Sequence, residues 1–133
     1  MKKNGIIIVG PPDNRNAALL EHLAASGFDI FPASTVEEMA EKLGASNWRI
    51  ILIDCAIDNK NTQLATRHIR ECFGQSVALI MLARSNRLVE RLRAWRLGAD
   101  AVLNNPAHIH EIRLVVEQLC LRLAHLDMPI QVN

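Results

Sequence analysis

Five short apolar runs alternate along the chain with segments whose apolar residues recur at helical spacing. They occupy residues 6–9, 28–31, 50–53, 77–82 and 101–103. Four of them are continuous, as in strands that are buried on both faces, whereas 28–31 is interrupted by Asp29 and predicts a weaker strand. Apolar residues three and four positions apart predict the helices, at Leu19, Leu20, Leu23 and Ala24; Val36, Met39, Ala40 and Leu43; Leu64, Ile69 and Cys72; Leu88, Leu92 and Trp95; and Ile109, Ile112, Val116, Leu119 and Leu123. The residues expected to end the first four helices are Gly27, Gly44, Gly74 and Gly98.

This alternation predicts an α/β fold. Because no hairpin dipeptide separates two runs, successive strands should be parallel and joined by right-handed crossovers. The natural closure is a doubly wound five-stranded parallel sheet of flavodoxin-like order 2-1-3-4-5, with helices on both faces. Ligands bind such sheets beyond the carboxyl ends of the strands, so the candidate site positions are Gly10-Pro11-Pro12, Asp54, Ala83 and Asn104-Asn105. We expect one domain over residues 1–124 and a tail, or the start of a linker to an output domain, over residues 125–133.

The length, charge and cysteine content of the chain limit the classes of protein to which it can belong. A chain of 133 residues with 50% apolar side chains can build one domain with a real core. A formal net charge of +1 gives no support for direct nucleic-acid binding by this segment. The apolar run at residues 6–9 is too short for a signal peptide or membrane span, so a cytoplasmic location is expected. Cys55, Cys72 and Cys120 form no CxxC pair and should be reduced, buried, small apolar residues.

Two sequence patches carry a resemblance to a known family. Ile51-Leu52-Ile53-Asp54 looks like a buried strand ending in a phosphoacceptor aspartate, and residues 97–106 resemble the family's Gly-Ala-Asp, short strand, then Lys-Pro. With the matching order of elements, they make the chain similar to the receiver domains of bacterial response regulators over roughly residues 5 to 124. The resemblance implies an aspartate that accepts phosphate from a histidine kinase, with a magnesium ion held by that aspartate and two acidic residues after the first strand.

The positions that the resemblance assigns to this chemistry are mostly changed. The acidic pair falls on Gly10 and Pro11, the hydroxyl after the fourth strand on Ala83, and the lysine on Asn105. Only Asp54 remains, and a carboxylate without metal and cation is a poor acceptor. The family's aromatic switch position falls on Val102. We therefore expect an atypical pseudo-receiver that is not an enzyme, with weak or absent Mg²⁺ binding and Asp54 as a vestigial, solvated strand-end carboxylate.

The sequence is compatible with several alternatives. The main one is a receiver still phosphorylated at Asp54, with Asp13 and Asp58 rebuilding a cation site from shifted loop positions. Another is a flavodoxin-like small-molecule pocket, although Gly10-Pro11-Pro12 lacks the amide hydrogens of a phosphate-binding loop and is better interpreted as a rigid turn. His108 and His110 form an HxH pair, but no further zinc ligands are evident nearby, so exposed histidines at a helix start are favoured.

The fourth predicted helix is the strongest candidate for a protein-binding surface. Its region combines Leu88, Leu92 and Trp95 with Arg84, Arg87, Arg91, Arg93 and Arg96. In receivers the face of the fourth helix, fifth strand and fifth helix is the usual dimer surface, so the resemblance implies a homodimer here. The residues assigned to this interface are Arg87, Leu88, Arg91, Asp100, Glu111 and Glu117, with arginines pairing with carboxylates. The alternative is a solvated basic helix face with Trp95 in the core.

Overall fold

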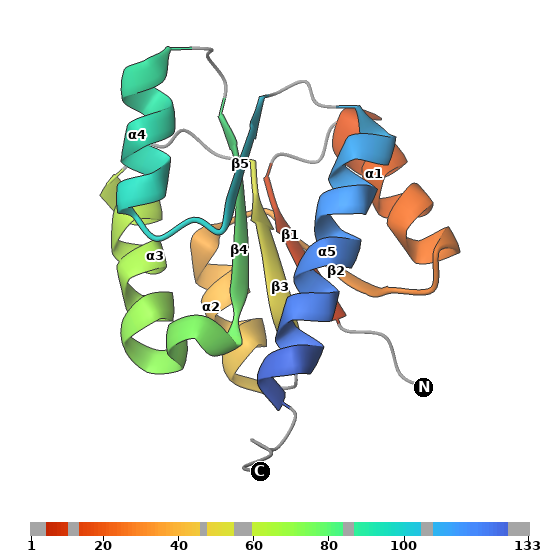
Figure 1. Cartoon of the computed structure of the whole chain (residues 1–133), viewed down its shortest axis with the longest axis horizontal. Helices are drawn as coiled ribbons and strands as arrows, with labels where there is room; N and C mark the ends of the chain where they lie inside the picture. The colour runs from red at the N-terminus through yellow and green to blue at the C-terminus, as the bar shows by residue number, and fades with distance from the viewer. Residues whose placement is uncertain are drawn as a thin grey trace, which may run out of the picture.

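The computed structural model describes residues 5–10, 14–45, 48–54, 60–83, 87–104 and 108–127. Strands and helices alternate along these residues, with one short 3-10 helix between the third helix and the fourth strand (Figure 1). In chain order the elements are β1 (Gly5–Val9), α1 (Asn14–Ala25), β2 (Asp29–Ala33), α2 (Val36–Ala45), β3 (Trp48–Ile53), α3 (Lys60–Phe73), η1 (Gly74–Ser76), β4 (Ala78–Ala83), α4 (Leu88–Arg96), β5 (Ala101–Asn104) and α5 (Ile109–Asp127).

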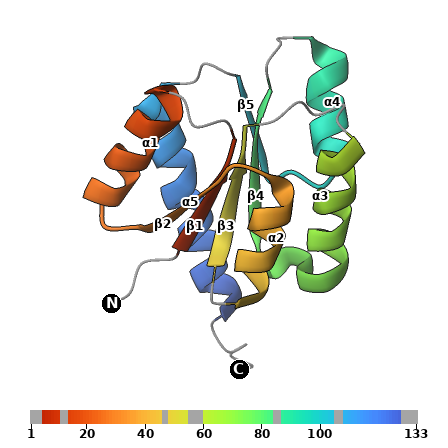
Figure 2. The same cartoon turned by 180° about the vertical axis from the view of Figure 1, so that it is seen from behind.

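The strands form one parallel sheet in the order β2-β1-β3-β4-β5, which confirms the predicted fold class. Helices α1 and α5 cover one face, and α2, α3 and α4 cover the other (Figures 1 and 2). Side chains alternate between the two faces along each strand. Ile6 and Ile8 pack in the core under α1 and α5, whereas Ile7 and Val9 pack in the core under α2, α3 and α4.

The helix boundaries correct some sequence expectations. Gly27, Gly74 and Gly98 have positive φ angles where α1, α3 and α4 end, as predicted. Gly44 does not end its helix, because α2 continues to Ala45. Helix α5 extends to Asp127, so residues 125–127 belong to the helix and not to a tail. Residues 128–133 lie outside the described part of the chain.

Helical spacing also misjudged which residues face the core. On α3 Ile69 is buried as predicted, but Leu64 is 53% exposed, and Thr62 and Thr66 are buried in addition. On α4 Ala94 is the buried residue, and the three apolar residues whose spacing predicted this helix are exposed. Those exposed residues are Leu88, Leu92 and Trp95. The idea that Trp95 belongs to the core is therefore wrong.

The cysteines differ from expectation as well. Both described cysteines are free thiols, as predicted. The expectation of burial is wrong for Cys72, which is exposed, whereas Cys120 is partly buried and packs against the core under α1 and α5. Cys55 lies outside the described residues. Within the described ranges, no helix is long and apolar enough to cross a membrane.

Candidate functional site

The candidate site lies where β1, β3, β4 and β5 reach their carboxyl ends. Asp54 directly follows β3, and its backbone N–H donates to the carbonyl oxygen of Val9 at 2.7 Å. Gly10 directly follows β1, and its N–H donates to the carbonyl oxygen of Ala33 at 3.0 Å. These bonds extend the parallel ladders by one residue each. The bond from Asp54 to Val9 joins β3 to β1 and so brings Asp54 beside Gly10, as the sheet order predicted.

The contact between Gly10 and Asp54 is close. A Cβ atom added at Gly10 would lie 3.1 Å from both the Cβ and the carbonyl oxygen of Asp54, and 3.0 Å from Nδ2 of Asn16. Gly10 therefore packs directly against Asp54 and Asn16, without a side chain between them. A larger residue at position 10 would require the Asp54 backbone or Asn16 to shift.

Asp54 is buried, with 3% of its surface exposed. The expectation of a solvated carboxylate at the strand end is therefore wrong. A buried carboxylate is held by hydrogen bonds or ion pairs rather than by bulk water, and Asp54 does have an interaction within the protein. Asp54 is thus a buried residue at the carboxyl end of β3.

The other described positions of the site carry aliphatic or amide groups. Ala83 is fully buried and is the last residue of β4, where it pairs with Asn104 of β5. Val102 is 5% exposed and belongs to the core under α2, α3 and α4. A valine in this position fills core volume, and its side chain has few alternative rotamers to adopt. The predicted positions Pro11, Asp13, Asp58, Asn105 and Pro106 lie outside the described residues.

The HxH pair has a third histidine beside it. The rings of His108 and His110 are stacked with centroids 5.1 Å apart, and His22 of α1 meets His110 edge-on at 5.1 Å. Sequence inspection missed His22, because it lies far away along the chain. Partial desolvation, the Arg113 guanidinium and the two neighbouring imidazoles lower the pKa of His110 below its ordinary value. No group of three or more metal-ligating side chains has suitable geometry within the described ranges, here or elsewhere.

Asp100 has a different role from the one predicted. One carboxylate oxygen accepts from the Leu79 backbone N–H and from Arg70 Nη2, both at 2.7 Å, and the other accepts from Arg122 Nη2 at 2.6 Å. Arg70 also donates to the carbonyl oxygens of Gly98, Gly74 and Val77. The Asp100 side chain is only 8% exposed. It is an internal anchor and is not available to a dimer partner, which corrects its assignment to the interface.

The pKa of Asp100 reflects this anchoring. Burial raises the pKa, but the hydrogen bonds from Leu79, Arg122 and Arg70 and the charge of Arg70 outweigh burial and hold it below the ordinary value. The cluster joins α3, β4, β5 and α5. The Gly-Ala-Asp patch that carried the family resemblance is thus part of the scaffold.

The remaining predicted interface residues are at the surface of α4 and α5. Leu88 is 69% exposed, and Arg91 Nη1 lies 3.4 Å from Oδ1 of Asn104. Glu117 forms an exposed ion pair with Arg113 at 3.8 Å within α5. Arg87 and Glu111 are exposed. We call Leu88, Leu92, Trp95 and their neighbour Arg91 the α4 face.

The sheet order, the aspartate after β3 and the Gly-Ala-Asp segment before β5 are the features in which this chain resembles the receiver domains of the response-regulator class. No family model matches the chain. The sequence is 28% identical over 102 residues to the aerobic respiration control protein ArcA of Escherichia coli K12, covering 77% of this chain and 42% of ArcA. It is 22% identical over 118 residues to the TorCAD operon transcriptional regulatory protein TorR of the same strain, covering 89% of this chain and 50% of TorR. The chain therefore spans half or less of these relatives.

Solved structures show the same fold. The receiver domain of TorR superposes with a TM-score of 0.82 at 22% identity, covering 90% of this chain and 98% of that domain. A CheY-like response regulator receiver domain from Methanospirillum hungatei JF-1 gives a TM-score of 0.81 at 15% identity, covering 92% of this chain and 98% of that one. The predicted resemblance to receiver domains is confirmed.

Proposed function

We propose that the chain is a pseudo-receiver that signals by protein contact and is not switched by phosphorylation of Asp54. The observation that carries the proposal is the contact of Gly10 with Asp54. The resemblance assigns one metal-holding carboxylate to position 10, where even a Cβ atom would come within 3.1 Å of the Asp54 carbonyl oxygen. Position 10 therefore lacks the carboxylate, and a side chain there would require Asp54 or Asn16 to shift by a few tenths of an ångström.

The chemistry of phosphoryl transfer supports this proposal. The transferred group carries its charge on three oxygens, and catalysis depends on metal and cationic groups that stabilise this charge. Around Asp54 the resemblance places Gly10, Pro11, Ala83 and Asn105, none of which can supply a carboxylate, a hydroxyl or a cation. We accordingly expect Mg²⁺ to bind weakly or not at all. The alternative is residual phosphorylation at Asp54 through acidic residues of the neighbouring loops.

Phosphodonor titration separates the two functions. The protein is incubated with acetyl phosphate and Mg²⁺, or with beryllofluoride and Mg²⁺, and followed by intact-protein mass and by Trp fluorescence. The receiver domain of TorR serves as the positive control, and Asp54→Asn is the matched variant of this chain. We expect no phosphoprotein and no saturable fluorescence change in either wild type or Asp54→Asn. A saturable change in wild type that Asp54→Asn abolishes would establish the phosphoacceptor alternative instead.

The α4 face supports a specific mode of contact. We propose that two copies pair through it, with Arg91 meeting Glu111 or Glu117 of the other copy. Apolar side chains as exposed as Leu88, at 69%, and Trp95, at 49%, favour burial against a partner. Exposed ion pairs contribute only about 0–1 kcal/mol each, so the apolar residues would supply the affinity and the charges would set the register.

Charge reversal tests this pairing. Arg91→Glu should weaken self-association measured by sedimentation equilibrium, because it places like charges across the two-fold axis. The matched control is Arg67→Glu on exposed α3, which should leave association unchanged. Wild-type protein that remains monomeric at high micromolar concentration would exclude the homodimer. An output domain or a separate regulatory protein would then be the better partner for this face.

A further inference from the structure

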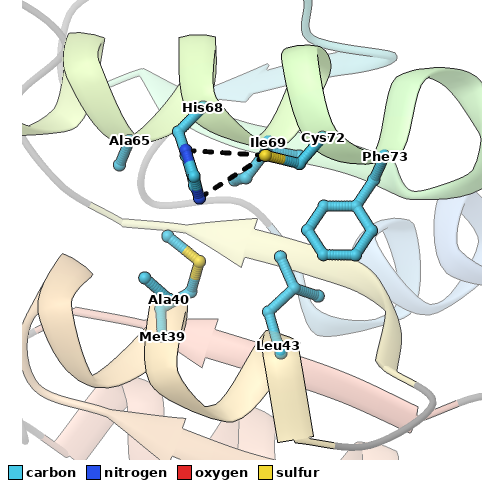
Figure 3. Close-up of a pocket in the computed structure, with 9 residues that line it drawn as sticks. Met39, Ala40, Leu43, Ala65, His68, Ile69, Cys72 and Phe73 are labelled. Atoms are coloured by element: carbon cyan, nitrogen blue, oxygen red, sulfur yellow. Dashed lines mark hydrogen bonds between the residues drawn. The ribbon is translucent and has the colours of Figure 1, made fainter.

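Helices α2 and α3 lie side by side on the same face of the sheet and enclose a groove of about 110 Å³ (Figure 3). Its apolar wall comes from both helices. The residues that matter here are Met39 and Leu43 of α2 and Ile69 and Phe73 of α3. Met39, Leu43 and Ile69 also belong to the buried core. The groove is therefore an apolar recess backed by the core, and it is separate from the Asp54 site.

A thiol and an imidazole also line this groove. His68 and Cys72 are one helical turn apart on α3, so their side chains project on the same side of the helix. The sulfur of Cys72 lies 3.7 Å from both Nδ1 and Nε2 of His68. In either neutral tautomer one ring nitrogen carries no proton, and a small rotation of the His68 ring turns the in-plane lone pair of that nitrogen toward the thiol. Both residues are exposed, so a reagent can reach them.

We propose that Cys72 is a site of covalent modification by soft electrophiles of the α,β-unsaturated carbonyl class that carry a short apolar group. The thiolate is the reactive form of cysteine, and His68 is placed to take up the thiol proton. The sulfur electron pair forms a bond to the β-carbon, and the C=C π pair moves to the α-carbon as an enolate. The imidazolium of His68 then returns the proton to the α-carbon. A thioether results, His68 is neutral again, and nothing is oxidised or reduced.

The groove determines which electrophile is preferred. Its volume is well below the roughly 300–1,000 Å³ of sites for drug-sized ligands, so it accepts only a small group. The apolar wall favours an alkyl or aryl substituent and disfavours a charged one, because a charge would lose its hydration there. Ala40 of α2 lines the groove and is exposed, which provides a position for changing its polarity. This inference does not depend on whether Asp54 is phosphorylated.

Two maleimides that differ in one substituent test the site. The full chain is treated with N-phenylmaleimide or N-(2-hydroxyethyl)maleimide, and the modification rate at Cys72 is measured by peptide mass mapping. Glutathione provides the reference ratio for a free thiol, and Cys120 is the internal reference. We expect the phenyl-to-hydroxyethyl rate ratio at Cys72 to exceed that of glutathione by about five- to tenfold, as burial of roughly 50 Å² of apolar surface would produce. An equal ratio at Cys72 and in glutathione would overturn the proposal.

Variants separate the effect of the groove on selectivity from the effect of His68 on the reaction rate. Ala40→Glu should abolish the phenyl preference at Cys72, whereas the matched Ala24→Glu on exposed α1 should preserve it. His68→Gln should slow modification of Cys72 several-fold at neutral pH and make its rate rise more steeply with pH. A preference that survives Ala40→Glu would contradict the role of the groove. An unchanged rate and pH profile in His68→Gln would contradict proton uptake by His68. Circular dichroism of each variant verifies that it is folded.

Discussion

The anchor at Asp100 gives the sharpest stability prediction. Replacing Asp100 by alanine leaves the Leu79 N–H without its 2.7 Å acceptor and the Arg70 guanidinium without its 2.7 Å counter-ion. The Asp100 and Arg70 side chains are 8% and 16% exposed, so water replaces these partners poorly. Removing one member of a buried ion pair typically destabilises a protein by about 3–5 kcal/mol. The Arg122 contact adds little, about 0–1 kcal/mol, because that side chain is 43% exposed.

Urea denaturation followed by circular dichroism measures this loss. We expect Asp100→Ala to lower the free energy of unfolding by about 3–5 kcal/mol, and Asp100→Asn by about 1–3 kcal/mol, because the amide keeps one acceptor oxygen. The matched controls are Asp29→Ala and Asp29→Asn at an exposed residue of β2, which should stay within about 0.5 kcal/mol of wild type. Losses at Asp100 no larger than those at Asp29 would refute the anchor.

The pKa of Asp100 adds a pH dependence. The folded-state pKa is lowered, so the unfolded chain binds the proton more tightly than the folded chain does. The stabilisation is therefore fully present above the unfolded value of about 4 and is lost as pH falls through the folded value. The difference between wild type and Asp100→Asn should be largest at neutral pH and shrink below about pH 4. A difference in stability that grows on acidification would contradict a lowered pKa of Asp100 in the folded state.

Two further predictions concern Gly98 and Gly10. Gly98→Ala should lower the free energy of unfolding by at least the roughly 1–2 kcal/mol that an alanine at positive φ costs. The loss should exceed that of Gly74→Ala, because the added Cβ would lie 3.0 Å from Arg70 Nε at position 98, whereas no atom lies within 4 Å of the added Cβ at position 74. Equal losses in urea denaturation would show that the Arg70 contact does not matter. The double variant Gly10→Asp with Pro11→Asp should bind Mg²⁺ weakly at best in calorimetry and switch little with beryllofluoride, and robust phosphorylation of it would show that the rest of the site is intact.

The sheet was predictable because parallel strands buried on both faces are continuous apolar runs. Residues 6–9 and 77–82 are of this kind, and such runs require helices on both sides. Strand order then follows from crossover handedness and from the short connections between elements. The approach of Gly10 to Asp54 follows in turn, because the two residues directly follow neighbouring parallel strands.

Helix orientation was less predictable, and α4 shows why. The spacing of Leu88, Leu92 and Trp95 fits one side of a helix, and the usual assumption is that an apolar side faces the core. In α4 the small residue Ala94 occupies the inner position, and the apolar side faces outward. Hydrophobic spacing defines a side of a helix without saying what covers it. The apolar side of a helix can be buried against a second protein as well as against the sheet of its own domain.

The Asp100 cluster could not be predicted, because its partners are distant in sequence. Arg70 and Leu79 come from α3 and β4, whereas Arg122 comes from α5. Single-sequence periodicity carries no information about such pairings. Asp100 therefore looked like a surface charge beside arginines. Only the folded geometry shows that both carboxylate oxygens are already occupied inside the molecule.

The residues that reveal the fold family are thus different from those that would perform its chemistry. Gly98 and Asp100 bind Arg70 and hold α3, β4 and β5 together, so their loss would damage folding whether or not the domain accepts phosphate. Gly10 and Ala83 lie where the resemblance places catalytic side chains, and neither has a side-chain carboxylate or hydroxyl. A chain can therefore keep the scaffold residues and the receiver fold while the phosphorylation chemistry is lost. Resemblance at Gly98 and Asp100 is evidence of fold, and the side chains around Asp54 are the evidence on function.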